Sequence, residues 1–193
     1  MSPAPAWLRA RFGHRAFLLK LLPAGSIGAE IGVYRGRFSA QILQLVRPRV
    51  LHLVDPWQHE EGEVYRNALF GGRSRGGQAG MDACLARVRS KFAGEITAGR
   101  VVIHRGFSGD VLSRFADAHF DWIYIDGNHL FEFVRLDLEL AWRKTRAGGV
   151  ICGDDYVDGG WWKGDVRKAV DGFVCERSIA VLAIRNRQFA LRR

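Results

Sequence analysis

The sequence is short of the residues that mark several classes of protein. It has only three cysteines in 193 residues, Cys84, Cys152 and Cys175, too few and too far apart for a disulfide framework or a Cys-x-x-Cys zinc site. We therefore expect reduced thiols and a cytoplasmic protein. No apolar stretch approaches the roughly 20 residues of a membrane span. The apolar run 16–22 is interrupted by Lys20 and lacks the small-residue cleavage site of a signal peptide.

Acidic residues are scarce near the N-terminus. The chain has 29 Lys and Arg against 20 Asp and Glu, a net charge of +9, and its first 50 residues hold eight basic residues against the single acid Glu30. Such a segment is typical of proteins that bind nucleic acid or an anionic membrane surface. It is equally typical of a helix that covers the core or the mouth of a substrate site, and we favour a helical cover over residues 1–24.

Strand and helix patterns alternate along the chain. Short apolar runs predict strands at 50–55, 101–106, 120–126 and 150–155, a first strand within 27–36, where the apolar run passes into glycines, and a closing hairpin at 178–184 and 188–192. Helical spacing predicts helices at 6–22, 38–46, 81–92, 110–115, 130–145 and 165–173. The alternation indicates an α/β fold, a parallel sheet with helices on both faces. With no repeat and no linker, we expect residues 1–193 to form one domain. The polar segment 58–80 predicts either a mobile lid or a disordered surface loop.

Chemically useful residues gather where the predicted strands end. In open α/β sheets ligands bind outside the carboxyl ends of the strands, so these ends are candidates for a site. The first strand leads into Glu30-x-Gly32-x-x-x-Gly36, and the second ends on Asp55. Glycines allow a tight turn and a close approach of backbone amides to a ligand. By themselves these two features also fit an ordinary turn and a solvated aspartate.

Together with Phe107 and Ser108 after the third strand, this pattern resembles the class I S-adenosylmethionine-dependent methyltransferases from about residue 27 onward. The resemblance implies a Rossmann-like, doubly wound, mainly parallel seven-stranded sheet in the order 3-2-1-4-5-7-6, with the last strand antiparallel. It also implies a cofactor site. Gly32 and Gly36 would lie under the methionine part of S-adenosylmethionine, Glu30 would support the loop and the methionine amine, and Asp55 would hold the ribose. Phe107 and Ser108 would edge the adenine, and Asp126 would border the cofactor.

Three carboxylates follow two neighbouring strands: Asp126, then Asp154 and Asp155. Burying three acids together is costly unless a cation compensates them. Oxygen ligands suit a hard divalent metal such as magnesium. His129 comes three residues after Asp126 and can face the same cleft. The alternatives are that the paired aspartates cap a loop and that His129 caps a helix.

This arrangement resembles the metal-dependent O-methyltransferases of the catechol and macrolide-sugar types. Both carry a carboxylate after strand four, a D-[DN] pair after strand five, and a base three residues beyond the first carboxylate. The base is lysine in the catechol type and histidine in the sugar type, so this chain matches the sugar type. The resemblance implies that Asp126, Asp154 and Asp155 bind the metal and that His129 deprotonates a substrate hydroxyl, which then attacks the sulfonium methyl group.

The predicted activity is therefore methyl transfer to a hydroxyl of a small molecule, a sugar or a phenol. Trp161 and Trp162 could wall its pocket, and the basic N-terminal quarter could steer an anionic substrate towards it. The chain could also act as a homo-oligomer. One alternative is an RNA methyltransferase, although the sequence lacks the N/D-P-P-Y/F motif of base-amine methyltransferases. A second is a non-catalytic subunit that binds S-adenosylmethionine.

Overall fold

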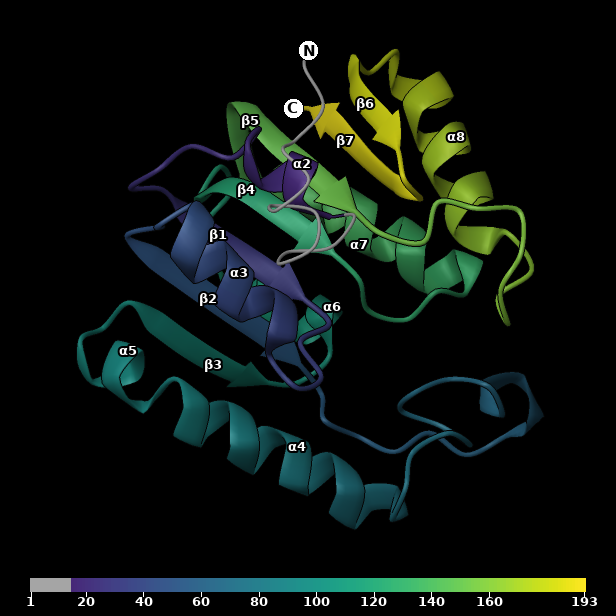
Figure 1. Ribbon diagram of the computed structural model, residues 1–193. Helices are drawn as coiled ribbons and strands as arrows, with labels where there is room; N and C mark the ends of the chain where they lie inside the picture. The colour runs from purple at the N-terminus through teal and green to yellow at the C-terminus, as the bar shows by residue number, and fades with distance from the viewer. Residues whose placement is uncertain (1–14) are drawn as a thin grey trace.

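A computed structural model describes residues 15–193 (Figure 1). Residues 6–14 of the predicted helix over 6–22, and residues 1–14 of the proposed cover over 1–24, lie outside the described residues. In the described part the helix ends at Leu19, three residues before the predicted end. This part is the short helix α2 (Ala16–Leu19), whose Leu18 and Leu19 are buried in the core. Among residues 15–193, no helix has the length and apolar character needed to cross a membrane.

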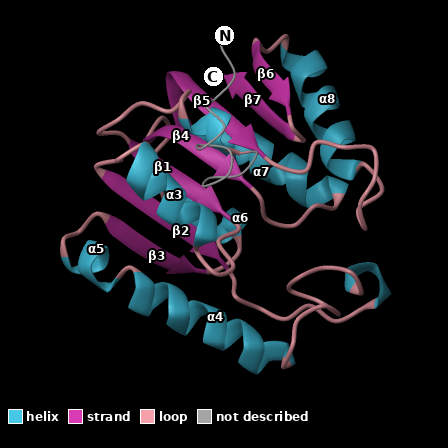
Figure 2. Ribbon diagram, in the orientation of Figure 1, coloured by secondary structure: helices cyan, strands magenta, loops and turns pink. Residues whose placement is uncertain are grey.

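Seven strands form one sheet in the order β3-β2-β1-β4-β5-β7-β6 (Figure 2). The strands are β1 (Ile27–Ile31), β2 (Val50–Asp55), β3 (Val101–Arg105), β4 (Phe120–Ile125), β5 (Thr145–Gly153), β6 (Val181–Arg185) and β7 (Gln188–Arg192). β1 pairs in parallel with β2 and β4, as does β2 with β3 and β4 with β5, whereas β7 is antiparallel to both of its neighbours. The predicted strand order and the antiparallel last strand are confirmed.

Helices cover both faces of the sheet because successive side chains of a buried strand point in opposite directions. On β4, Trp122 and Tyr124 pack towards α2, α3 (Arg37–Leu45) and α4 (Gly77–Lys91). Ile123 and Ile125 pack towards α6 (Ser108–Ser113), α7 (Phe131–Lys144) and α8 (Asp165–Arg177). The doubly wound architecture places the carboxyl ends of the parallel strands at one open edge.

Element boundaries differ from the predicted ones where glycines lie. α4 begins at Gly77, four residues before the predicted start, after a left-handed turn at Gly76. β5 begins at Thr145 rather than 150, because its glycine pair permits close approach to β4: a Cβ on Gly149 would lie 2.6 Å from the carbonyl oxygen of Asp121. The short helices η1 (Glu63–Tyr65) and α5 (Ala93–Thr97) have no counterpart in the predicted pattern.

Two histidines lie side by side within the sheet, away from the cavity described below. His52 of β2 and His104 of β3 approach to 2.9 Å between Nδ1 and Nε2. Their rings are surrounded by Phe115 and Phe120. Burial, reinforced by the nearby His104 and His119, lowers the pKa of His52 to about 4. Burial also lowers the pKa of His104, so both histidines of the pair are held in the neutral state.

We expect this pair to make the fold sensitive to acid. The unfolded chain takes up a proton at His52 below its ordinary pKa of 6.5, whereas the folded chain does so only near 4. Stability is therefore lost as pH falls from 6.5 to 4, by about 3 kcal/mol at most. Chemical denaturation of wild type and His52→Gln across this window measures the difference. Equal pH slopes for the two proteins would contradict the assignment.

Candidate active site

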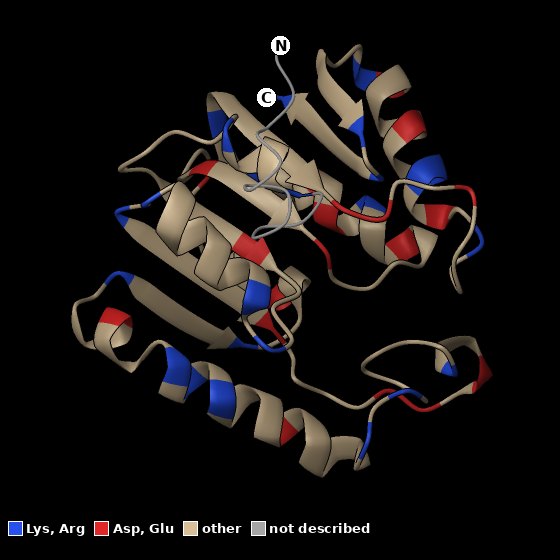
Figure 3. Ribbon diagram, in the orientation of Figure 1, with Lys and Arg blue, Asp and Glu red and all other residues tan. Residues whose placement is uncertain are grey.

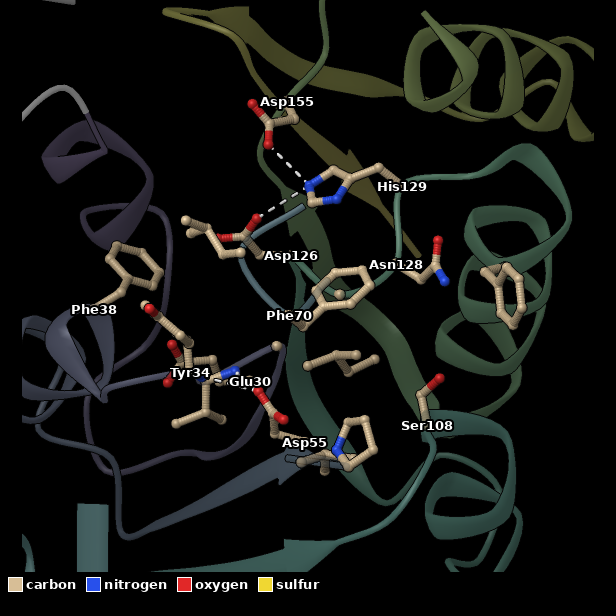
Figure 4. Close-up of a pocket in the computed structure, with 18 of the residues that line it drawn as sticks. Glu30, Tyr34, Phe38, Asp55, Phe70, Ser108, Asp126, Asn128, His129 and Asp155 are labelled. Atoms are coloured by element: carbon tan, nitrogen blue, oxygen red, sulfur yellow. Dashed lines mark hydrogen bonds and ion pairs between the residues drawn. The ribbon is translucent and has the colours of Figure 1, made fainter. Parts of the chain in front are cut away.

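A cavity of about 870 Å³ lies at the open edge of the sheet (Figure 4). Most residues predicted to form the site line it: Glu30, Gly32, Asp55, Phe107, Ser108, Asp126, His129 and Asp155. Gly36 and Asp154 do not line it. A cavity of this size is ordinary for a cofactor with a small substrate.

The glycine loop follows β1 and packs directly against the end of β4. Gly32 has a left-handed φ of +85°, and a Cβ there would lie only 1.9 Å from the carbonyl oxygen of Asp126. No other residue fits this approach without moving the backbone. Gly36 has a φ of +63° and precedes the first residue of α3. The loop therefore forms a tight floor for one end of the cavity.

Asp55 holds this loop in place. Its Oδ2 accepts hydrogen bonds from the backbone amides of Val33 and Tyr34, both at 2.8 Å, and its Oδ1 accepts one from Trp57 at 2.6 Å. A carboxylate offers about four acceptor sites, so Oδ1 retains one for a further donor. The predicted contact of Asp55 with a ribose remains a prediction, and the loop-holding role was not foreseen.

Glu30 is the most deeply buried acid of the cavity lining. It is only 1% exposed, and its Oε2 has no hydrogen-bond partner. Burial raises the pKa of its carboxyl to about 8. A buried carboxyl oxygen without a partner is costly, and a cationic ligand group placed beside it would relieve that cost. Glu30 therefore fits the amine of a bound methionine group.

At the other end of the cavity, His129 lies between two carboxylates. Its Nε2 is 2.8 Å from Oδ2 of Asp155 and 3.5 Å from Oδ1 of Asp126. The ring stacks on Trp162 with a centroid separation of 4.6 Å. Burial alone would lower the pKa of His129, but the two carboxylates outweigh it and raise the pKa to about 9. One ligand atom from each of the three residues lies within 4.8 Å of the others, a spacing that a metal ion could bridge.

Asp154, the third predicted metal ligand, is directed elsewhere. Its carboxylate forms an ion pair with Arg15, and its Oδ1 accepts a hydrogen bond from the Gln188 side chain at 3.2 Å. Arg15 also donates to Oδ2 of Asp126 at 2.7 Å and so bridges the two acids. The metal contact predicted for Asp154 remains a prediction.

The acids of this cluster are balanced by cations of the chain itself. Arg15 forms ion pairs with Asp126 and Asp154, and Arg187 forms one with Asp155. Protonated His129 supplies a third positive charge. Acidic and basic segments are interspersed over the described chain rather than separated (Figure 3). A divalent ion would therefore compete with internal cations for the carboxylates.

Aromatic rings border the cavity beside His129: Phe70 and Trp161 line it, and Tyr65 packs against both. Tyr65 and Phe70 come from the predicted lid segment 58–80, and their ring centroids lie 5.7 and 6.0 Å from that of Trp161. The Asn128 side chain donates a hydrogen bond to the Tyr65 hydroxyl at 3.0 Å. The segment is thus packed over the cavity, as a lid would be, whereas its movement stays a prediction.

Sequence reasoning missed three charged residues of the site: Arg15, Arg187 and Asp137. Asp137 lines the cavity from the middle of α7, is 2% exposed, and accepts a hydrogen bond from the Ser108 hydroxyl. Burial raises the pKa of its carboxyl to about 7. Helical spacing could have revealed it, because it shares the buried face of α7 with Val134 and Ala141. No local sequence pattern of this kind marks Arg15 or Arg187 as a residue of the site.

Comparison with known proteins identifies the fold. A family model described as a methyltransferase domain matches residues 29–156. None of the curated proteins compared with the chain matches it.

Solved structures resemble the chain over nearly its whole length. The O-methyltransferase NovP is 20% identical with a TM-score of 0.63, over 96% of this chain and 77% of its own. An O-methyltransferase from Bacillus cereus in complex with SAH is 15% identical with a TM-score of 0.61, over 100% of this chain and 83% of its own. A candidate rRNA methylase from Clostridium thermocellum is 12% identical with a TM-score of 0.61, over 99% of this chain and 96% of its own. At these identities the likeness establishes a shared fold.

Proposed function

The chain belongs to the methyltransferase-domain family, and we propose that it transfers a methyl group from S-adenosylmethionine to a hydroxyl of a small molecule, a sugar or a phenol. One observation carries this proposal. The glycine loop with Glu30, and His129 with Asp126 and Asp155, line a single cavity. A methyl donor and an acceptor could therefore be held together in it.

When bound, S-adenosylmethionine supplies a methyl group on a sulfonium centre, and a divalent cation supplies positive charge that lowers the pKa of a nearby hydroxyl. The chain's own residues do the rest. Glu30 binds the methionine amine, and Asp55 accepts a hydrogen bond from the ribose. His129 is protonated in the free protein and first releases that proton to solvent. It then takes the acceptor proton at Nε2, and Asp126 and Asp155 stabilise the resulting imidazolium, as their effect on its pKa indicates. The rings of Tyr65, Phe70 and Trp161 exclude water.

The donor set is compatible with a divalent cation. Asp126, Asp155 and His129 bring two carboxylates and an imidazole within bridging distance, and Asp154 adjoins Asp126 through their shared partner Arg15. We propose that Asp126, Asp154 and Asp155 hold magnesium, as the resemblance implies, once Arg15 gives up its carboxylates. Asp126 and Asp154 would then pair with Arg15 in the free protein and with the metal ion when it is bound.

Calorimetry with S-adenosylmethionine, with and without magnesium, tests the proposal. We expect saturable binding of one cofactor per chain and a mass increase of one methyl group on an acceptor in a screen of hydroxylated small molecules. Absence of cofactor binding would overturn the whole proposal. Turnover that is unchanged by a chelator would overturn only the metal's part in it.

We expect Arg15→Ala to bind divalent metal more tightly than wild type. The substitution removes a positive charge that contacts Asp126 at 2.7 Å and also pairs with Asp154. Since like charges a few Å apart repel by several kcal/mol near a protein surface, affinity should rise at least about tenfold. Titration with Mn²⁺ followed by electron paramagnetic resonance measures it. Arg37→Ala, which removes a charge from the cavity without touching these acids, is the control; equal affinities for all three proteins would contradict the expectation.

A second candidate is methylation of RNA. The net charge of +9 and the fold shared with a candidate rRNA methylase favour it. It predicts tight RNA binding that weakens steeply with salt. The pairing of Arg15 and Arg187 with acids of the cavity counts against it, because these charges are not available to phosphates.

The proposed setting is the cytoplasm. All three cysteines are free thiols, and two of them, Cys84 and Cys152, are buried in the core. Thiols kept reduced are typical of that compartment. We also propose that the acceptor carries negative charge, which the basic residues of the cavity lining, such as Arg37 and Arg73, would attract.

A further inference from the structure

A group of basic residues lies at the edge of the sheet opposite the cavity, where the parallel strands begin. We call this surface the amino edge and define it as loops 20–26, 47–49 and 146–149 with the last residues of β7. Basic segments are visible there at the starts of β2 and β5 (Figure 3). β1 and β2 have five and six residues, so about 16–20 Å separates the amino edge from the cavity. The proposed methyl transfer uses none of its residues.

The amino edge has a clear excess of positive charge. It carries five exposed basic side chains and adjoins one acid, Asp121 at the start of β4; the basic residues are Lys20, Arg47, Arg49, Arg146 and Arg192. The Asp121 carboxylate is already engaged, since it contacts Arg146 at 2.7 Å and accepts a hydrogen bond from the Ile27 amide at 2.6 Å. Within residues 15–193, the side chains of Lys20, Arg47 and Arg49 have no hydrogen-bond or ion-pair partner. Uncompensated cations of this kind attract a polyanion.

These cations form one continuous row. The Arg49 amide donates to the Ser26 carbonyl oxygen at 2.7 Å, so the turn before β2 packs against the loop before β1. A cavity of about 300 Å³ continues the row towards β7, and the basic residues that line it are Lys20, Arg146 and Arg192. With neighbouring strands about 4.8 Å apart, the row from β2 to β7 extends over about 19 Å. It is long enough to contact several successive phosphates of one strand.

The chemistry of the row favours nucleic-acid phosphates over other polyanions. Four of its five cations are arginine, whose guanidinium can bind a phosphate through two parallel hydrogen bonds. Stable membrane binding usually requires apolar side chains that insert beside the basic ones, and protein interfaces usually have an apolar centre. Loops 20–26, 47–49 and 146–149 contain none of the large apolar side chains that are exposed in the described part of the chain.

We propose that the amino edge binds the phosphate backbone of a nucleic acid and so anchors the protein to it. Contacts with phosphates carry no base information, so binding is independent of sequence and weakens with salt. Because the cavity lies at the other edge of the sheet, it stays open to a small acceptor while the nucleic acid is bound. This partner is therefore distinct from an RNA that enters the cavity to be methylated.

Fluorescence polarisation with a labelled oligouridylate RNA tests the proposal. Raising potassium chloride from about 50 to 200 mM should weaken binding by wild type about 20- to 50-fold, as expected for three or four contacts with phosphates of a single strand. In Arg47→Ala/Arg49→Ala, the plot of log affinity against log salt concentration should be shallower by about 1.4. Affinity at the lower salt concentration should be at least about tenfold weaker than that of wild type.

The matched control is Arg87→Ala/Arg89→Ala, the same two changes at the same spacing on exposed residues of α4. This part of α4 lies beside the glycine loop, since a Cβ on Gly36 would be 3.4 Å from Val88. We expect the control to bind RNA as wild type does.

Several results would overturn the proposal. Wild type that does not bind the RNA, or whose affinity does not depend on salt, would exclude a phosphate-binding surface. If RNA instead enters the cavity as a methyl acceptor, Arg47→Ala/Arg49→Ala would bind it as wild type does. Binding to phosphatidylserine vesicles but not to RNA would replace the nucleic acid with a membrane. If the double variant does not fold, Lys20→Ala should make the plot shallower by about 0.7, and an unchanged slope would contradict the assignment.

Discussion

Replacement of His129 by alanine is expected to lower kcat by at least about 100-fold, the usual contribution of a positioned general base. His129 is the only described histidine in the cavity lining, and its Nε2 faces Asp126 and Asp155. Its loss leaves Asp126 paired with Arg15 and Asp155 with Arg187, so neither acid loses its last cationic partner. The affinity for S-adenosylhomocysteine should stay nearly unchanged, because His129 lies at the acceptor end.

Steady-state kinetics with an acceptor from the screen, together with calorimetry, measures both effects. His119→Ala is a suitable control, since His119 packs on Phe115 and Phe120 outside the cavity. Comparable loss in the two variants would indicate damage to the fold. Retention of wild-type kcat in His129→Ala would contradict the assignment of the base.

The sequence predicts the fold and the edge of the sheet that carries the site, because both follow from patterns local to single elements. Apolar runs of strand length separated by helical spacing require a parallel sheet, and parallel strands bring Glu30, Asp55 and Asp126 to one edge. The sequence does not predict which residues form ion pairs. Arg15 and Asp126 are 111 positions apart, and nothing in the sequence selects this arginine among 24.

The adjacent aspartates show a second limit. Neighbouring residues of an extended chain point to opposite sides, so Asp154 and Asp155 cannot be assigned to one ligand from their sequence alone. In the structure Asp155 has a left-handed φ of +60°, which turns its carboxylate towards His129, whereas Asp154 stays with Arg15 and Gln188. The direction in which a side chain points at the end of a strand depends on the backbone dihedral angles, and the residue types do not specify these angles.

Substitution of Glu30 by glutamine is expected to stabilise the free protein and weaken cofactor binding. Burial raises the pKa of Glu30 from 4.5 to about 8. Between these values the unfolded chain releases a proton that the folded chain retains, so the stability present below pH 4.5 is lost as pH rises through 8. Glutamine removes this loss, a gain of about 3 kcal/mol at pH 7. Without the carboxylate, affinity for S-adenosylhomocysteine should fall about 10- to 100-fold.

Denaturant unfolding at pH 5 and pH 8 and calorimetry with S-adenosylhomocysteine test the two effects separately. Glu60→Gln, the same change on a partly exposed residue of the cavity lining, should leave the stability unaltered. Stability that falls in Glu30→Gln at pH 8 would mean that the folded carboxyl is ionised and well paired. Because Glu30 and His52 change stability in opposite directions between pH 6.5 and 4.5, their effects offset each other there in the wild-type pH profile, and the single variants resolve them. A stabilised variant that binds cofactor poorly would identify Glu30 as a residue whose buried charge is kept for ligand binding.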